Sequence, residues 1–194
     1  MKLTIKHQES YSRGELILRS LFGFLYIMLP HVFLLMFVQI WAMIVTFIAW
    51  WAILFTGRYP QSFFEFMVGL FRWSLRVNAR IYNLSDDYPA FGINATDEYT
   101  SLEVEYPESL SRGHLLLKSF LGAFYCVLPH AFVLYFRMIW GMILSFLAFW
   151  VVLFTGEYPK NWHEFNVGTI RWSTRLNLYM NFMTDEYPPF SGQE

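Results

Sequence analysis

The chain has 194 residues, of which 56% are hydrophobic, 21% are aromatic and only 15% are charged. Soluble domains carry about 25% charged residues, so this composition is typical of a membrane protein. The formal net charge of −1 argues against a nucleic-acid-binding protein, which would show a basic excess. The single cysteine, Cys126, excludes a disulfide within the chain and any cysteine-based metal cluster.

The first predicted element is a short strand near the N-terminus. Apolar or aromatic residues alternate with polar ones there and again later in the chain, at Leu3, Ile5, His7, Leu102, Val104 and Tyr106. Alternation with a period of two predicts strands. Lys6 and Glu105 occupy equivalent positions, so we expect opposite charges across a strand pair. Because a lone two-stranded ribbon is only marginally stable, it is expected to lie on helices or beside a partner chain.

A long apolar block follows at residues 21–55 and returns at residues 120–154. Each block is about 35 residues long, roughly 50 Å as a helix, and a bilayer core is about 30 Å thick. One interpretation is a transmembrane hairpin with helices at residues 14–36 and 41–56 and a turn near Gln39. The alternative is a single crossing by residues 31–55, with the earlier part on the membrane surface.

The placement of charge favours the hairpin. In that arrangement every lysine and arginine except Arg137, at the second turn, lies on one side of the membrane. This asymmetry predicts four spans with both termini in the cytoplasm. In the single-span alternative the two units are inverted, and the basic residues divide between both faces.

A proline within each apolar helix precedes a histidine, at Pro30-His31 and Pro129-His130. Two histidines on membrane helices can ligate a haem or a metal ion. We expect instead that His31 and His130 are a structural pair of polar residues at helix kinks, bonded to carbonyl groups that the prolines free. Large side chains surround both, so no cofactor and no metal are predicted.

A second kind of helix is predicted at residues 61–83, with an apolar stripe and a separate basic stripe. Such a helix lies in the headgroup region of a membrane. Four arginines of this helix and its second copy are candidates for binding anionic lipid phosphates: Arg72, Arg76, Arg171 and Arg175. The alternative is internal pairing of these arginines with carboxylates, at Glu65, Glu164, Asp86 and Asp185.

All of these elements occur twice. Residues 3–91 align without a gap on residues 102–190, and roughly half of the aligned positions are identical. The predicted organisation is a first membrane repeat (residues 1–92), a linker (93–101) and a second membrane repeat (102–194). The fold class is an all-α integral membrane protein in which each repeat has a short strand, a transmembrane hairpin and an amphipathic interfacial helix.

Three motifs occur in both copies. They are Phe-Thr-Gly-x-Tyr-Pro at Phe55 and Phe154, Arg-Trp-Ser-x-Arg at Arg72 and Arg171, and Asp-x-Tyr-Pro at Asp86 and Asp185. Together they resemble the signature of a bacterial membrane family, domain of unknown function 4389. The resemblance covers nearly the whole chain and implies a bacterial inner-membrane location, but no activity. Ala90 departs from the second proline of the last motif.

No nucleophile, phosphate-binding or zinc signature is present, so an enzyme is not predicted. The leading hypothesis is a scaffold or accessory subunit that acts by self-association or by assembly with a larger membrane complex, in contact with membrane lipids. The alternative is a transport or lipid-handling protein with a path between the two repeats.

Overall fold

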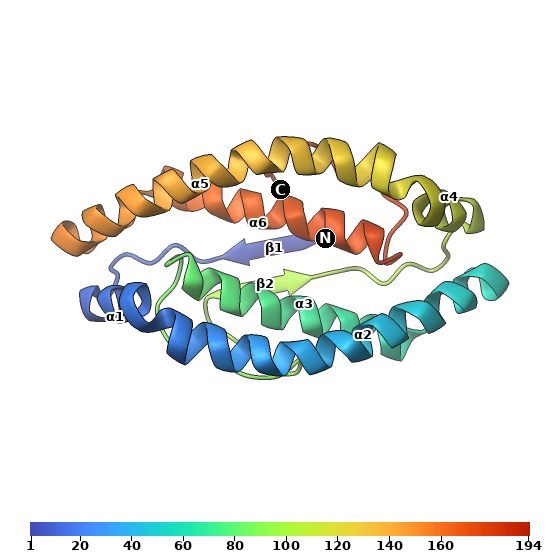
Figure 1. Ribbon diagram of the computed structural model, residues 1–194, viewed down its shortest axis with the longest axis horizontal. Coiled ribbons are helices and arrows are strands. Elements are labelled where there is room, and N and C mark those ends of the chain that lie inside the picture. The colour runs from blue at the N-terminus through green and yellow to red at the C-terminus, as the bar shows by residue number, and fades with distance from the viewer.

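The computed structural model describes all residues of the chain, 1–194. Helices and one two-stranded ribbon make up the molecule (Figure 1). In chain order the elements are β1 (Lys2–Ile5), α1 (Arg13–Gly23), the π-helical segment η1 (Phe24–Met28), α2 (Leu29–Thr56), α3 (Gln61–Ile81), β2 (Thr100–Glu103), α4 (Arg112–Gly122), the π-helical segment η2 (Ala123–Val127), α5 (Leu128–Thr155) and α6 (Lys160–Met180). The second half repeats the element order of the first, as the sequence duplication predicts.

The predicted transmembrane hairpin is wrong. Segments α1, η1 and α2 form one continuous bent helix of 44 residues, and α4, η2 and α5 form a second. The helix passes through Gln39 without a turn because Val38, Gln39 and Ile40 include no glycine or proline to break it. Arg137, predicted to lie at the second turn, is likewise inside α5. Both helices are long and apolar enough to cross a membrane, which suggests membrane association.

Local sequence explains where the long helix begins and ends. The Ser12 side chain caps its N-terminus, since Ser12 Oγ accepts the Glu15 N–H at 3.3 Å. Gly57, with φ of 72°, ends it in the left-handed conformation that glycine adopts without strain. Ser111 and Gly156 do the same in the second copy.

The predicted amphipathic helix of the first repeat exists as α3, and α6 is its second copy. Each runs back along the long helix of its own repeat (Figure 1). It is more buried than a helix lying alone among headgroups, because it packs between the long helix and the ribbon. Phe64, Met67, Leu70 and Trp73 are buried on α3.

The two predicted strands pair with each other and are shorter than the alternation indicated. β1 and β2 are antiparallel, and Leu3 lies opposite Leu102. The opposed charges are Lys2 and Glu103 rather than the predicted Lys6 and Glu105. Leu3 and Leu102 are buried against the helices, as a ribbon this small requires.

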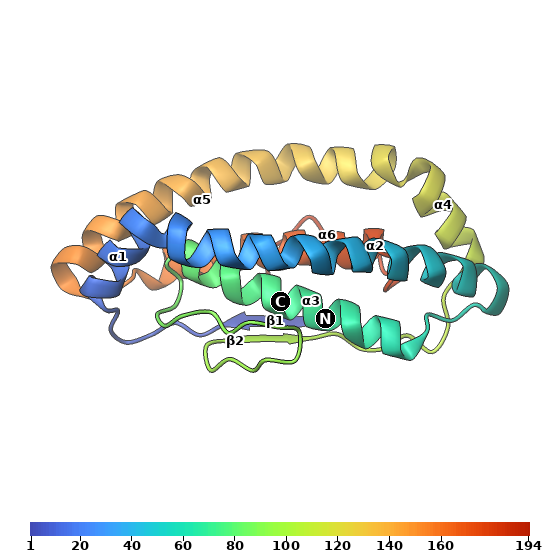
Figure 2. The ribbon, with the colours of Figure 1, turned by 60° about the horizontal axis from the view of Figure 1, so that its bottom comes forward.

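Leu3 and Leu102 are also equivalent residues of the two repeats. An antiparallel pair of equivalent residues defines a local twofold axis, so the repeats are related by a half-turn. Figure 1 is viewed approximately along this twofold axis. A half-turn in the plane of the view brings the lower half of the molecule onto the upper half. Figure 2 shows that the ribbon and both termini lie on the opposite side of the molecule from the arch of α5.

The repeats are interlocked at their ends. The Leu110 N–H donates to the Gly57 carbonyl, and the Tyr11 N–H donates to the Gly156 carbonyl, both at 2.8 Å. Arg112 reaches the Phe55 carbonyl, and Arg13 reaches the Phe154 carbonyl. The C-terminal end of each long helix therefore accepts hydrogen bonds from the residues at the start of the other long helix.

Candidate functional site

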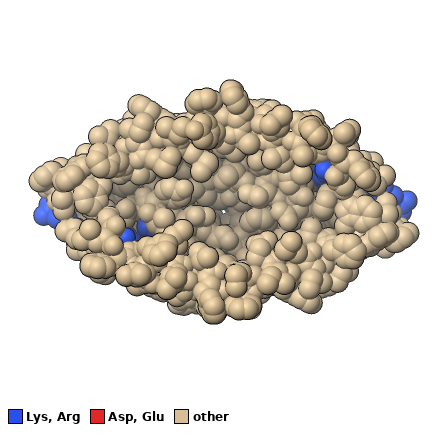
Figure 3. All heavy atoms as spheres, in the orientation of Figure 1, with Lys and Arg blue, Asp and Glu red and all other residues tan.

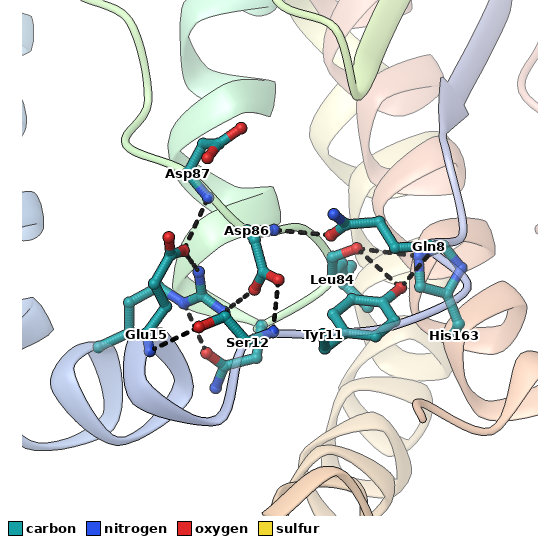
Figure 4. Close-up of polar contacts among 10 residues, drawn as sticks. Gln8, Tyr11, Ser12, Glu15, Leu84, Asp86, Asp87 and His163 are labelled. Carbon is teal, nitrogen blue, oxygen red and sulfur yellow. Dashed lines mark hydrogen bonds and ion pairs between the residues drawn. The ribbon is translucent and has the colours of Figure 1, made fainter. Parts of the chain in front are cut away.

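Polar residues gather where α1 begins (Figure 4). The Asp86 carboxylate accepts the Ser12 backbone N–H at 2.7 Å and binds the Arg19 guanidinium at 2.8 Å. Gln8 accepts the Asp86 N–H, and Glu15 accepts the Asp87 N–H, both at 2.8 Å. In the second copy Asp185 makes the equivalent contacts: it accepts the Ser111 backbone N–H at 2.6 Å and binds the Lys118 ammonium group at 2.9 Å.

This arrangement corrects one expectation from the sequence. The partners of Asp86 and Asp185 are Arg19 and Lys118, not the arginines of the second helix. Both cations are buried, and each is neutralised by a carboxylate from the end of its own repeat. The Asp-x-Tyr-Pro motif therefore closes each repeat onto the start of its long helix.

Tyr11 and His163 join the repeats beside this site. The Tyr11 hydroxyl donates to the Leu84 carbonyl at 3.4 Å, and the His163 ring nitrogen Nε2 lies 3.1 Å from the same oxygen. Figure 4 shows both side chains converging on Leu84. Burial raises the pKa of Tyr11 to about 12 and lowers the pKa of His163 to about 4. Both side chains are thus neutral hydrogen-bonding groups at neutral pH.

His31 and His130 lie in two matching aromatic cages. The Trp73 indole N–H donates to His31 Nδ1 at 2.8 Å, and Phe91 stacks on the imidazole with ring centroids 4.0 Å apart. Trp172 and Phe190 enclose His130 in the same way, at 2.8 Å and 3.9 Å. Because an indole nitrogen only donates, Nδ1 must be the acceptor, and Nε2 carries the proton of the neutral ring.

The predicted bonds between the histidines and the carbonyl groups freed by the prolines do not form, because tyrosine hydroxyls bind those carbonyls. The Tyr88 hydroxyl donates to the Tyr26 carbonyl at 2.9 Å, and the Tyr187 hydroxyl donates to the Tyr125 carbonyl at 3.1 Å. These carbonyls belong to the residues four positions before Pro30 and Pro129, where the helical bond is lost. The histidine Nε2 atoms, by contrast, are buried without a partner.

No group of three or more His, Cys, Asp or Glu side chains is positioned to hold a metal ion. Each imidazole is closed within the aromatic residues of its own repeat, and its Nδ1 atom is occupied by tryptophan. The structure therefore does not bring His31 and His130 together in one site. That the protein binds no cofactor and no metal stays a prediction.

The four arginines predicted to bind lipid phosphate contact the chain itself. Arg76 is buried and donates to the carbonyls of residues 90, 92 and 95. Arg171 is buried and donates to the Leu3 and Gly192 carbonyls, and it also pairs with Glu164 at 3.2 Å. Arg72 and Arg175 each donate to one backbone carbonyl and keep part of their surface exposed.

These contacts support internal bonding over lipid binding for Arg76 and Arg171. Their partners are mostly backbone carbonyls of the ribbon, the linker and the C-terminal tail rather than the predicted carboxylates. No Arg72–Glu65 pair forms, whereas Arg171–Glu164 does. The third arginine of α3, Arg80, holds Asp97 of the linker. The interior arginines thus fasten irregular segments to α3 and α6.

One face of the molecule is almost entirely apolar (Figure 3). It is formed by the two long helices. On each helix one narrow stripe of residues is buried, and large apolar side chains on the rest of its surface are exposed. Phe47 and its equivalent Phe146 are both 64% exposed. No acidic atom is visible on this face, and basic atoms are confined to its two ends and a few inner points.

A hollow lies in the middle of the apolar face (Figure 3). It has a volume of about 370 Å³, and its walls come from α3, α5 and α6. Uncharged polar side chains predominate among them: Ser74, Asn78, Tyr82, Asn166, Thr169, Ser173, Thr174 and Asn177. None of the lining residues is charged, and Met138, Gly141 and Met142 of α5 form one wall.

A family model described as "Domain of unknown function (DUF4389)" matches residues 16–92 and again residues 119–192. The chain belongs to this family. It carries two tandem copies, as the resemblance of the motifs implied. No curated protein and no solved structure matches the chain.

Each DUF4389 copy contains a complete aromatic cage and the aspartate that closes the repeat. The first includes His31, Trp73, Asp86 and Phe91, and the second includes their equivalents. The strands and most of the linker lie outside both copies. In this chain the aspartates and the cages thus lie within the matched units, whereas the ribbon lies outside them.

Sequence reasoning missed the hollow. Asn78 and Asn177 are identical at equivalent positions, as are Ser74 and Ser173. Four uncharged polar residues at equivalent positions of the two amphipathic helices were the available signal. Sequence alone does not show that the two helices pack side by side, so it does not bring these four residues together.

Proposed function

We propose that the protein is a non-enzymatic scaffold or accessory subunit that is embedded in one leaflet of the bacterial inner membrane. Its long helices lie parallel to the membrane plane, and the ribbon face meets the aqueous phase. The observation that carries this proposal is the division of the molecule into one apolar face and one charged face.

The position of the ribbon supports insertion in one leaflet over crossing. The ribbon lies halfway along the long helices (Figure 1). If those helices crossed the bilayer, the exposed Lys2, Glu98 and Glu103 would sit at the depth of the bilayer centre. Charged side chains at that depth cost about 2.5–3.5 kcal/mol each on insertion scales. With the twofold axis along the membrane normal, the same residues remain in water.

The ends of the long helices fit the same orientation. Arg13 and Arg112 begin the two long helices, and Arg58 and Lys160 follow their ends. Their long side chains can reach the headgroups from helices that lie in the leaflet. Both termini then share one side of the membrane, and the basic residues of the ribbon face support a cytoplasmic side. The proposal includes self-association or assembly with a larger complex through the ribbon face.

Impermeant maleimide labelling of single cysteines in sealed vesicles tests this topology, in a Cys126→Ala background. The diagnostic positions are Glu9, before α1, Gln61, after α2, and Gln39 in the middle, with Glu98 as the ribbon control. Insertion in one leaflet predicts that Glu9, Gln61 and Glu98 are labelled from the same side and Gln39 from neither. Labelling of Glu9 and Gln61 from opposite sides would show that the helix crosses. Labelling of Gln39 from the side opposite to Glu98 would instead support the four-span arrangement.

The alternative function, lipid handling, is favoured by a different observation. A hollow with a polar floor opens onto the apolar face, where lipid molecules would be the neighbours of the protein. A lipid could enter it without crossing water. The competing functions are distinguished by whether the hollow holds a lipid.

A further inference from the structure

The hollow places hydrogen-bonding groups where the bilayer offers few partners. Its floor is formed by α3 and α6, and the one long helix that lines it is α5. Polar groups facing hydrocarbon without a partner are unfavourable. Something with polar atoms should therefore occupy the floor, and something apolar should occupy the opening.

The hydrogen bonds within the protein leave a distinct set of groups free. On the α3 wall the Ser74 hydroxyl, the Asn78 amide and the Tyr82 hydroxyl make no hydrogen bond within the chain, so their donors are free. On the α6 wall the donors are used internally: Asn177 Nδ2 binds the Ser173 carbonyl, and the Thr174 hydroxyl binds the Ile170 carbonyl. Asn177 Oδ1 remains as an acceptor. The α3 wall thus offers both donors and acceptors, whereas the α6 wall offers mainly acceptors.

The charge of the hollow limits the chemistry of its occupant. No lysine, arginine, aspartate or glutamate lines it. The nearest cation, Arg137, lies behind the lining residue Thr169 and already donates to the Thr169 hydroxyl and to the Phe165 carbonyl. A phosphate in the hollow would therefore meet no free counter-charge, which is unfavourable. An occupant with a hydroxyl group and an ester carbonyl would match the two walls, because it supplies one donor and one acceptor. The volume of about 370 Å³ lies within the range of small-molecule pockets.

We propose that the hollow binds a neutral glycerolipid with a free hydroxyl, of the diacylglycerol class. Its glycerol and ester groups lie on the floor between α3 and α6, and its acyl chains pass between α2 and α5 into the leaflet. This orientation matches that of the surrounding lipids, because the polar end points toward the ribbon face. The proposal deepens the lipid-handling alternative and rests on the proposed membrane embedding.

Photolabelling tests this site. Purified protein in detergent micelles is mixed with a diacylglycerol that carries a diazirine on one acyl chain, and crosslinked peptides are mapped by mass spectrometry. Labelling should be saturable, should fall on the α5 segment around Met138 and Met142, and should be displaced by unlabelled diacylglycerol but not by phosphatidylglycerol. The double variant Asn78→Leu/Asn177→Leu should weaken binding about tenfold, the effect of one or more lost hydrogen bonds.

The matched control is Asn161→Leu, the same change at an exposed position of α6 outside the hollow. It should label like the unmodified protein. Displacement by phosphatidylglycerol would show that a charged phospholipid occupies the hollow and would overturn the proposal, as would diffuse labelling along α2 and α5 or equal labelling of the double variant. If the double variant fails to fold, the displacement experiment on the unmodified protein still decides.

The micelle experiment also separates this inference from the proposed topology. Binding in micelles does not depend on how the protein sits in a bilayer. Site-specific labelling together with a crossing topology in vesicles would retain the lipid site and reject insertion in one leaflet. Diffuse or absent labelling in micelles, together with insertion in one leaflet in vesicles, would reject the lipid site and retain the topology.

Discussion

At the scale of single residues, the motifs turn out to be contacts between distant parts of one repeat. Trp73 of the Arg-Trp-Ser motif binds His31, and Asp86 of the Asp-x-Tyr-Pro motif binds Arg19. Tyr88, two residues after Asp86, supplies the bond that Pro30 removes from the helix. In this chain each of these motifs therefore contains a residue that holds the long helix in place.

The tryptophan–histidine bond should contribute measurably to stability. Trp73→Phe leaves His31 Nδ1 buried without a donor, which costs about 1–3 kcal/mol. We expect a lower thermal unfolding midpoint in detergent for Trp73→Phe and for Trp172→Phe. Trp51→Phe is the control, because Trp51 is exposed and makes no hydrogen bond within the chain. Equal midpoints for Trp73→Phe and Trp51→Phe would contradict the structural role of the cage.

His163 should make stability depend on pH. Burial lowers its pKa to about 4, whereas the unfolded chain has the ordinary value of 6.5. Between these values the unfolded chain holds a proton that the folded protein lacks, so stability falls as the pH falls from 6.5 to 4. The total effect is at most roughly 3 kcal/mol. His163→Gln should flatten this part of a plot of midpoint against pH, and an unchanged slope would show that other groups cause it.

At the scale of elements, the sequence correctly predicted the strands and helices whose apolar residues recur with a clear period. The strands at Leu3 and Leu102 and the helix starting at Gln61 lie where alternation and helical spacing predicted them. The hairpin prediction failed because it was based on the length of the apolar block and the placement of charges, neither of which shows whether the chain turns at Gln39. A helix lying in the leaflet has no upper limit of about 20 residues, so excess length did not require a turn at Gln39.

The contacts between elements were harder to predict because they join residues far apart in the chain. Arg19 and Asp86 are separated by 67 positions. Only the folded chain shows that Arg76 binds the linker carbonyls instead of lipid or Glu65. A basic stripe on a helix looks the same in sequence whether it faces headgroups or irregular backbone.

The linker packs closely on α3 at Gly69, which predicts that a larger residue at this position destabilises the protein. A methyl group added at Gly69 would lie 2.9 Å from the Ile93 carbonyl oxygen, which is backbone and cannot move aside easily. Gly69→Ala should therefore destabilise the protein by about 1–3 kcal/mol. Gly23→Ala is the matched control, because the added methyl would meet nothing closer than 3.8 Å. We expect Gly23→Ala to be neutral or slightly stabilising by the same thermal measurement, and the reverse order would refute this account.

At the scale of the whole molecule, the two repeats form one body and not two domains joined by a linker. One core cluster combines Ala49 and Phe64 of the first repeat with Leu115 and Leu178 of the second. The ribbon takes one strand from each, and each long helix ends on the start of the other. The half-turn between the repeats keeps both apolar surfaces on the same side and also pairs Leu3 antiparallel with its equivalent Leu102, whereas a translation would leave the two strands parallel.

This interlocking predicts that neither repeat folds alone. Residues 1–92 expressed without the rest would expose the core face of Ala49 and Phe64 and an unpaired strand at Leu3. We expect each half to be degraded or aggregated by itself, and we expect the halves to co-purify when residues 1–92 and 93–194 are made together with different tags. The physical reason is that a two-stranded ribbon and a shared apolar cluster form only when both halves are present.

The same experiment has a sharp control in the ribbon. Leu3→Lys buries an unpaired charge at the twofold axis, next to Leu102, and should abolish co-purification. Lys2→Leu, one position earlier on the exposed side of the strand, should not. A stable, monodisperse first half would show that the family unit is self-sufficient and that the duplication joins two finished modules. Failure of each half with recovery of the pair would show that the twofold arrangement is a condition of folding, because the apolar face and the hollow are completed only by both repeats.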